Sequence, residues 1–121
     1  MKLLFIALGS AIGGVARYLV GRLLASSSPF PWSTFVVNVV GCFIIGLIFG
    51  LVDRGMNVSE NARLFLTVGF CGGFTTFSTF AHENYLLFQS GNLIIVAAYA
   101  ALSFFVGILM AYAGHAVCQN I

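Results

Sequence analysis

The chain has 121 residues, of which 60% are hydrophobic and only 7% are charged, with a formal net charge of +2. A soluble domain carries about 25% charged residues, so this composition excludes an ordinary soluble globular domain. Five basic residues are too few for a nucleic-acid-binding surface, and we expect no nucleic acid partner. A membrane-spanning helix needs roughly 20 apolar residues, so four such helices with short loops fill the chain as one transmembrane domain.

The first predicted helix covers residues 3–24 and ends at the turn-forming segment 25–31, which contains three serines and two prolines. Lys2 and the apolar run behind it also resemble the start of a signal peptide. Because the run is long enough to span a membrane, we interpret it as a retained helix. The second predicted helix covers residues 34–52 and is closed by the polar residues 53–55.

The third predicted helix covers residues 62–89 and is too long and too interrupted for one ordinary helix. Gly72 and Gly73 each cost about 1 kcal/mol relative to alanine in a helix, and Thr76 is a good N-cap. We therefore predict two half-helices, with a break over residues 72–76 at mid-membrane. A kink softened by glycine is the alternative. The fourth predicted helix covers residues 93–117, after a tight turn.

Charge and small-residue spacing bear on how the helices assemble. Three basic residues fall on one side of the predicted membrane and two on the other, a weak bias that allows insertion in both orientations. Two inverted copies could then pair. Gly9 and Gly13 in the first helix, and Gly46 and Gly50 in the second, have the spacing that lets helices approach closely. This spacing alone does not separate contacts within a subunit from contacts between subunits.

Several side chains inside the apolar runs need a partner or a function. Arg17 either snorkels to the membrane interface or attracts an anion. Asn38 is either a link between helices or a hydrogen-bond donor in a site. Phe77 and Phe80 share one helix face. Packing against lipid is their default role, although the positive edge of an aromatic ring can also meet an anion.

The polar residues between positions 82 and 103 also allow more than one interpretation. Tyr99 and Ser103 lie four positions apart in the fourth helix, and they form a hydroxyl row or bond to backbone carbonyls. His82 and Glu83 form a vestibule, a proton-handling pair or an ordinary polar patch at the membrane interface.

Chemistry based on cysteines or catalytic motifs is not indicated. Three cysteines lack CxxC spacing, and we interpret them as small hydrophobic residues. The sequence contains no zinc-protease, serine-hydrolase or phosphate-loop motif, so we do not expect an enzyme.

Three motifs follow one another between residues 13 and 80, and they carry a resemblance that covers essentially all of the chain. They are Gly-Gly-Val-Ala-Arg-Tyr at 13–18, Thr-Phe-Val-Val-Asn-Val-Val-Gly at 34–41 and Gly-Phe-Cys-Gly-Gly-Phe-Thr-Thr-Phe-Ser-Thr-Phe at 69–80. Through these motifs the chain resembles the small bacterial fluoride channels of the CrcB, or Fluc, family. The resemblance implies an all-α protein of the bacterial inner membrane with four transmembrane helices, the third of them broken. It also implies an antiparallel, dual-topology homodimer with two pores, through which fluoride leaves the cytoplasm passively.

The resemblance further implies roles for individual residues. A structural sodium ion at the dimer centre would bind the backbone carbonyls of Gly72 and Thr75. The residues implied to line the fluoride pore are Asn38, Phe77, Ser78, Thr79, Phe80, Tyr99 and Ser103. Arg17 and Glu83 would lie in the vestibule. The family pattern also implies a hydroxyl near Gly107, where this chain has none.

Two other functions remain open for a small four-helix membrane protein. A multidrug or guanidinium exporter of this size needs a carboxylate in its first helix, and residues 3–24 contain none. A structural subunit of a larger membrane complex would show no ion flux when purified alone.

Overall fold

The computed structural model describes residues 1–120, and every regular element in that range is a helix. The elements in chain order are α1 (Lys2–Leu23), α2 (Trp32–Asp53), α3 (Glu60–Leu64), the π-helix η1 (Phe65–Cys71), α4 (Gly72–Phe74), α5 (Ser78–Gln89) and α6 (Leu93–Gln119). Elements α3 to α5 form one interrupted span. The four resulting spans are long and apolar enough to cross a membrane. The prediction of four transmembrane helices is therefore confirmed.

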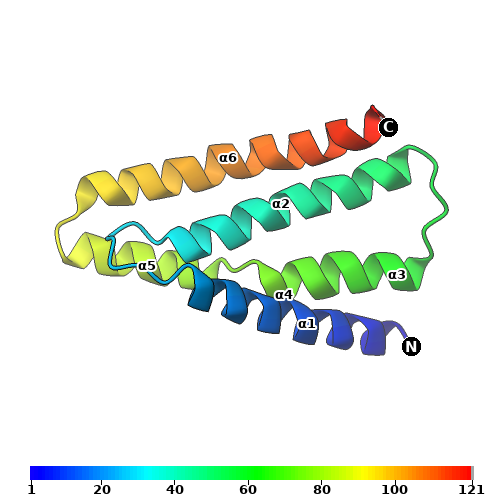
Figure 1. Ribbon diagram of the computed structural model, residues 1–121, viewed down its shortest axis with the longest axis horizontal. Helices are drawn as coiled ribbons and strands as arrows, with labels where there is room; N and C mark the ends of the chain where they lie inside the picture. The colour runs from blue at the N-terminus through cyan, green and yellow to red at the C-terminus, as the bar shows by residue number, and fades with distance from the viewer. Residues whose placement is uncertain (121) are drawn as a thin grey trace.

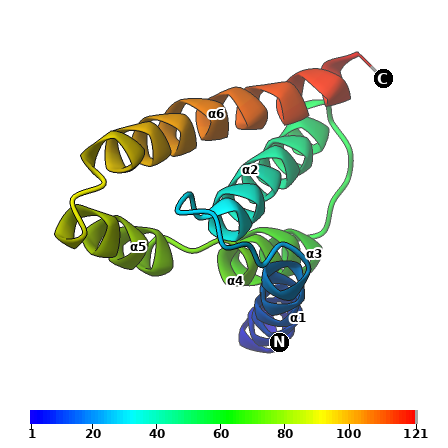
Figure 2. The ribbon, with the colours of Figure 1, turned by 60° about the vertical axis from the view of Figure 1, so that its left-hand side comes forward.

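The spans run side by side, and both chain ends lie at the same end of the bundle (Figure 1). Helix α2 packs along α6, whereas α1 packs along η1 and α4. Figure 2 shows α5 turned away from this second pair and leading into α6. The fold is thus two helix pairs, and the break in the third span lies where α5 leaves the pair formed with α1.

Glycines allow the close approach within both pairs. A Cβ atom added to Gly13 would collide with the Phe70 carbonyl oxygen and lie 2.9 Å from the Phe74 nitrogen. A Cβ atom at Gly46 would collide with the carbonyl oxygen of Ala111 in α6. Since real side chains do not tolerate such distances, the small-residue spacing seen in the sequence serves contacts within one chain.

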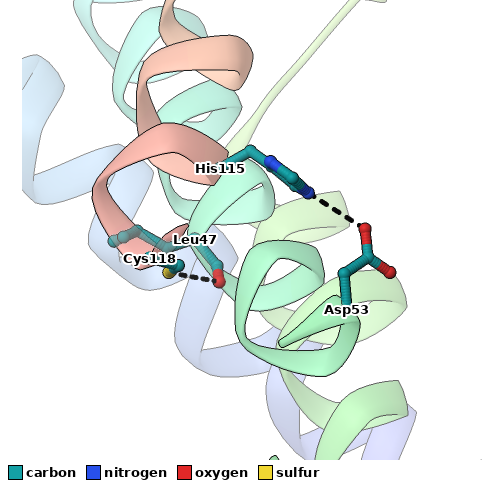
Figure 3. Close-up of polar contacts among 4 residues, drawn as sticks. All are labelled: Leu47, Asp53, His115 and Cys118. Atoms are coloured by element: carbon teal, nitrogen blue, oxygen red, sulfur yellow. Dashed lines mark hydrogen bonds and ion pairs between the residues drawn. The ribbon is translucent and has the colours of Figure 1, made fainter. Parts of the chain in front are cut away.

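Polar contacts hold the ends of α2 and α6 together (Figure 3). His115 Nε2 lies 2.9 Å from Asp53 Oδ2, and the Cys118 thiol donates a hydrogen bond of 3.2 Å to the Leu47 carbonyl. Arg54 Nη1 donates to the Cys118 carbonyl at 2.8 Å, which satisfies one of the free carbonyls at the end of α6. At the same end of the bundle, Lys2 pairs with Glu60 at 2.8 Å.

The break in the third span lies further along the chain than predicted. Gly72 and Gly73 remain helical in α4, so the predicted break at 72–76 is displaced to residues 75–77. Thr75 is extended, with φ −86° and ψ 161°, and the helix resumes at Ser78. Gly73 has a packing role instead, because a Cβ atom there would lie 2.6 Å from the Ser10 carbonyl in α1. The other helix ends fall within two residues of their predicted positions.

Candidate functional site

The side chain of Asn38, on α2, forms two hydrogen bonds with the unwound backbone of the third span. Its Oδ1 accepts a hydrogen bond of 2.8 Å from the Thr76 amide, and its Nδ2 donates one of 3.1 Å to the Thr76 carbonyl. An unwound peptide at membrane depth needs such partners, because no lipid group supplies them. The amide nitrogen of Asn38 carries a second hydrogen, which is available to a further acceptor.

This arrangement removes the helical donors from two carbonyls. In a continuous α-helix the Thr76 amide would donate to Gly72 and the Thr79 amide to Thr75. The Thr76 amide donates to Asn38 instead, and the Thr79 amide donates to the Thr76 hydroxyl at 3.2 Å. The Gly72 and Thr75 carbonyls, for which the family resemblance implies a sodium ion, therefore lose these donors. Carbonyl oxygens are suitable ligands for a hard cation.

An open pocket of about 530 Å³ lies beside the break, between α2 and α6. Its lining residues are Asn38, Gly41, Cys42, Ile45, Thr75, Thr76, Phe77, Phe80, Ala100, Ser103 and Phe104. Four of the predicted pore residues are in this set. Within the described part of the chain, the Ser103 hydroxyl oxygen is buried and has no hydrogen-bond partner. It is therefore free to bind something that enters the pocket.

The two predicted pore phenylalanines form one wall of this pocket. The ring centroids of Phe77 and Phe80 lie 5.8 Å apart, with the planes tilted by 41°. The Phe77 side chain protrudes from the surface of the single chain, in which the residue is 78% exposed. Phe80 lies inward, with its ring centroid 4.9 Å from that of Tyr99.

Glu83 lies at the centre of a hydroxyl cluster next to the pocket. The Tyr99 hydroxyl donates to its Oε1 at 2.9 Å, and the Thr34 hydroxyl donates to its Oε2 at 3.0 Å. Tyr99 is 0% exposed and binds Glu83 with its hydroxyl, so it is not part of the pocket lining. The sequence marks Thr34 as the start of the second helix but not as a partner of Glu83, because the two residues are 49 positions apart.

Arg17 belongs to a second pocket, of about 230 Å³. Thr34, Thr76 and Thr79 line this pocket together with Arg17, and Thr76 is shared with the larger pocket. The pocket of this arginine therefore adjoins the break. The exposed Ser78 lines neither pocket, and its hydroxyl lies 3.5 Å from that of Thr76.

Asn84 is a further polar residue that sequence reasoning did not identify. Its Nδ2 donates to the Phe80 carbonyl at 3.0 Å, and its buried Oδ1 has no partner among the described residues. Its neighbours in the sequence gave no signal for it, because burial of the amide oxygen is a property of the folded chain. His82 itself is exposed and lines neither pocket.

Comparison with known proteins identifies the family. Residues 4–115 match the family described as CrcB-like protein, Camphor Resistance (CrcB). The chain belongs to the CrcB-like family. Among relatives named fluoride-specific ion channel FluC, the protein of Flavobacterium psychrophilum is 40% identical over all of both chains.

Two other FluC relatives of this CrcB-like chain show the same agreement. The Agrobacterium fabrum protein is 44% identical, over 100% of this chain and 98% of its own length. The Rhizobium etli strain CIAT 652 protein is 48% identical, over 88% of this chain and 85% of its own length. Together with the four apolar spans, these matches make the CrcB-like chain a multi-pass bacterial membrane protein.

Proposed function

We propose that this CrcB-like chain is a fluoride-selective channel through which fluoride leaves the cytoplasm passively. The observation that carries the proposal is the pocket at the broken span, where Asn38, Ser103 and two phenylalanine rings converge. Relatives that match the whole chain are named as fluoride-specific ion channels, which agrees with this chemistry and with the expectation that the protein is not an enzyme.

The donors in the pocket suit a small, strongly hydrated anion. A selective pore must replace the ion's water without binding it too tightly to leave. Asn38 offers its second amide hydrogen, Ser103 offers a hydroxyl with no partner in the described chain, and the rings offer positive edges. Because each donor is weak, the ion is held by several groups in turn.

The functional unit in this proposal is an antiparallel homodimer with two pores. The pocket is open on one side, and Phe77 at its edge is 78% exposed, as expected for a surface that a second copy covers. The two ends of the bundle also carry equal formal charge. One end has three basic and two acidic residues and the other has two basic and one acidic, a net charge of +1 at each. Such a balance favours insertion in both orientations.

A sodium ion at the dimer centre is the proposed structural cofactor. The Gly72 and Thr75 carbonyls fit this role, since the amides that would bind them in a helix donate elsewhere. Two carbonyls from each of two copies would supply four oxygens, and sodium would link the broken helices across the dimer axis.

Arg17 and Glu83 are proposed to form the pore vestibule. The guanidinium of Arg17 is a cation, and its pocket adjoins the break at Thr76. It therefore attracts anions toward the pore. The Tyr99 and Thr34 hydroxyls hold Glu83 in place. Thr79, which lines the Arg17 pocket, follows Ser78 at the start of α5, the helix that also carries Glu83.

The alternative functions have weaker support. Helix α1 contains no aspartate or glutamate, so it lacks the carboxylate that a four-helix drug exporter requires.

Efflux from liposomes loaded with fluoride or with chloride tests the proposal. Purified protein should release fluoride rapidly and chloride at the background rate. Equal rates for both ions, or no release of either, as a purely structural subunit predicts, would overturn it.

A further inference from the structure

A row of two hydroxyl-bearing residues on α6 ends at Gly107. Tyr99, Ser103 and Gly107 follow one another at intervals of four, so they share one helix face. The first two carry hydroxyls and the third carries no side chain. A Cβ atom added at Gly107 would lie 3.3 Å from the sulfur of Cys42, on α2. The Cys42 thiol therefore occupies the space into which a side chain at position 107 would extend.

We propose that Cys42 supplies a pore-lining thiol that continues the fluoride path beyond Ser103, in place of a hydroxyl on α6. This inference rests on the proposed channel function. Cys42 and Ser103 line the same pocket from opposite helices, and Asn38 lies one helical turn before Cys42 on α2. Three polar groups thus follow one another along the pocket, from the amide to the hydroxyl and the thiol.

The hydrogen-bonding state of these groups supports the assignment. The Cys118 thiol, which is not in the pocket, donates to the Leu47 carbonyl at 3.2 Å (Figure 3). Over residues 1–120, by contrast, neither the Cys42 thiol nor the Ser103 hydroxyl has a hydrogen-bond partner. Two unused donors facing one pocket from two helices indicate a place for a ligand. An anion is the ligand that both donors can bind.

A thiol is a weaker donor than a hydroxyl. At this step it would stabilise fluoride enough to replace a water molecule but not enough to retain the ion, as conduction requires. A hydroxyl at the same place should therefore also conduct, whereas a methyl group should not replace it.

Substitutions in proteoliposomes test this role. Cys42→Ala should lower the fluoride efflux rate roughly fivefold, the equivalent of one hydrogen bond. Cys42→Ser should keep efflux within about twofold of the unchanged protein. The double variant Cys42→Ala with Gly107→Ser returns a hydroxyl to the vacated space from the opposite helix, and it should recover most of the lost rate. Cys118→Ala removes a thiol outside the pocket and is the matched control, with an unchanged rate.

Methylmercury provides a second test, which does not require a variant with a smaller side chain to fold correctly. The reagent replaces the thiol proton and adds bulk at the sulfur. It should block fluoride efflux through the unchanged protein and leave Cys42→Ser active, although both retain Cys71 and Cys118. Equal block of both proteins, or normal efflux by Cys42→Ala, would overturn the role of Cys42 alone. Absence of fluoride efflux from the unchanged protein would instead overturn the channel function on which this inference rests.

Discussion

Asn38 and Thr76 are 38 positions apart in the sequence, and two hydrogen bonds join the side chain of the first to the peptide groups of the second. The amide of Thr76 and its carbonyl are both bound by this one side chain. The bracket stabilises the break and also diverts the Thr76 amide from the Gly72 carbonyl. One asparagine thus contributes to the wall of the pocket and to the proposed cation site.

Asn38→Ala should destabilise the protein, because it leaves a peptide N–H and C=O without partners in the membrane. We expect the free energy of unfolding to fall by about 1–3 kcal/mol. Chemical unfolding of the detergent-solubilised protein, followed by circular dichroism, measures this change. Asn120→Ala is the control, since its amide makes one exposed hydrogen bond to Ala116. Equal stability of the two variants would contradict the bracketing role.

Gly13 and Gly14 should respond differently to alanine. A Cβ atom at Gly13 collides with the backbone of the third span, whereas one at Gly14 has nothing within 4 Å. Gly13→Ala should therefore cost about 1–3 kcal/mol of stability through overpacking. Gly14→Ala should be neutral or slightly stabilising, because alanine favours the helix. The same unfolding experiment compares the two variants, and similar values for both would refute the close packing of α1 against η1 and α4.

Phe80→Ile should impair fluoride flux and leave the proposed dimer intact. The substitution keeps an apolar side chain but removes the ring edge, and we expect a loss of roughly tenfold in efflux. Phe105→Ile changes an exposed ring on α6 and should conduct normally. Gel filtration checks the assembly of each variant. Normal flux through Phe80→Ile would exclude this ring from the pore.

Sodium should stabilise the protein in a concentration-dependent way, because a ligand that binds only the folded state raises its stability. Thermal unfolding in sodium chloride, compared with N-methylglucamine chloride at the same ionic strength, measures the effect. The unfolding temperature should rise with sodium only. The same temperature in both salts would mean that the Gly72 and Thr75 carbonyls do not hold the cation.

Dual topology predicts that the C-terminus is found on both sides of the membrane. A reporter fused after residue 121 should be labelled from the outside in about half of the molecules, since the two ends carry equal net charge. Adding two lysines beside the C-terminus should shift the population toward one orientation. A reporter that is accessible from one side only in the unchanged protein would contradict the antiparallel dimer.

The four spans could be predicted from hydropathy and turn residues, because each span is a local property of the sequence. The position of the break could not. Glycine propensity placed it at Gly72 and Gly73, but these residues stay helical, and Gly73 packs against Ser10 of α1. The helix ends where the Thr76 amide donates a hydrogen bond to Asn38. This is a tertiary contact, which helix propensities do not take into account.

The candidate site could be predicted only in part, because it too depends on tertiary contacts. Motif resemblance pointed to Asn38, Phe77 and Phe80, and the structure brings them to one pocket. The hydroxyl of Thr34 and the thiol of Cys42 were missed as site residues, because their significance depends on Glu83 and Gly107 in other helices.

The reversal potential of the current in a planar bilayer tests the central claim most directly. With a tenfold gradient of fluoride and equal chloride on both sides, passive fluoride-selective conduction predicts reversal at the fluoride equilibrium potential, about 59 mV in magnitude. This value should be insensitive to a proton gradient. Reversal near zero, or a reversal potential that follows the proton gradient, would contradict a passive fluoride channel.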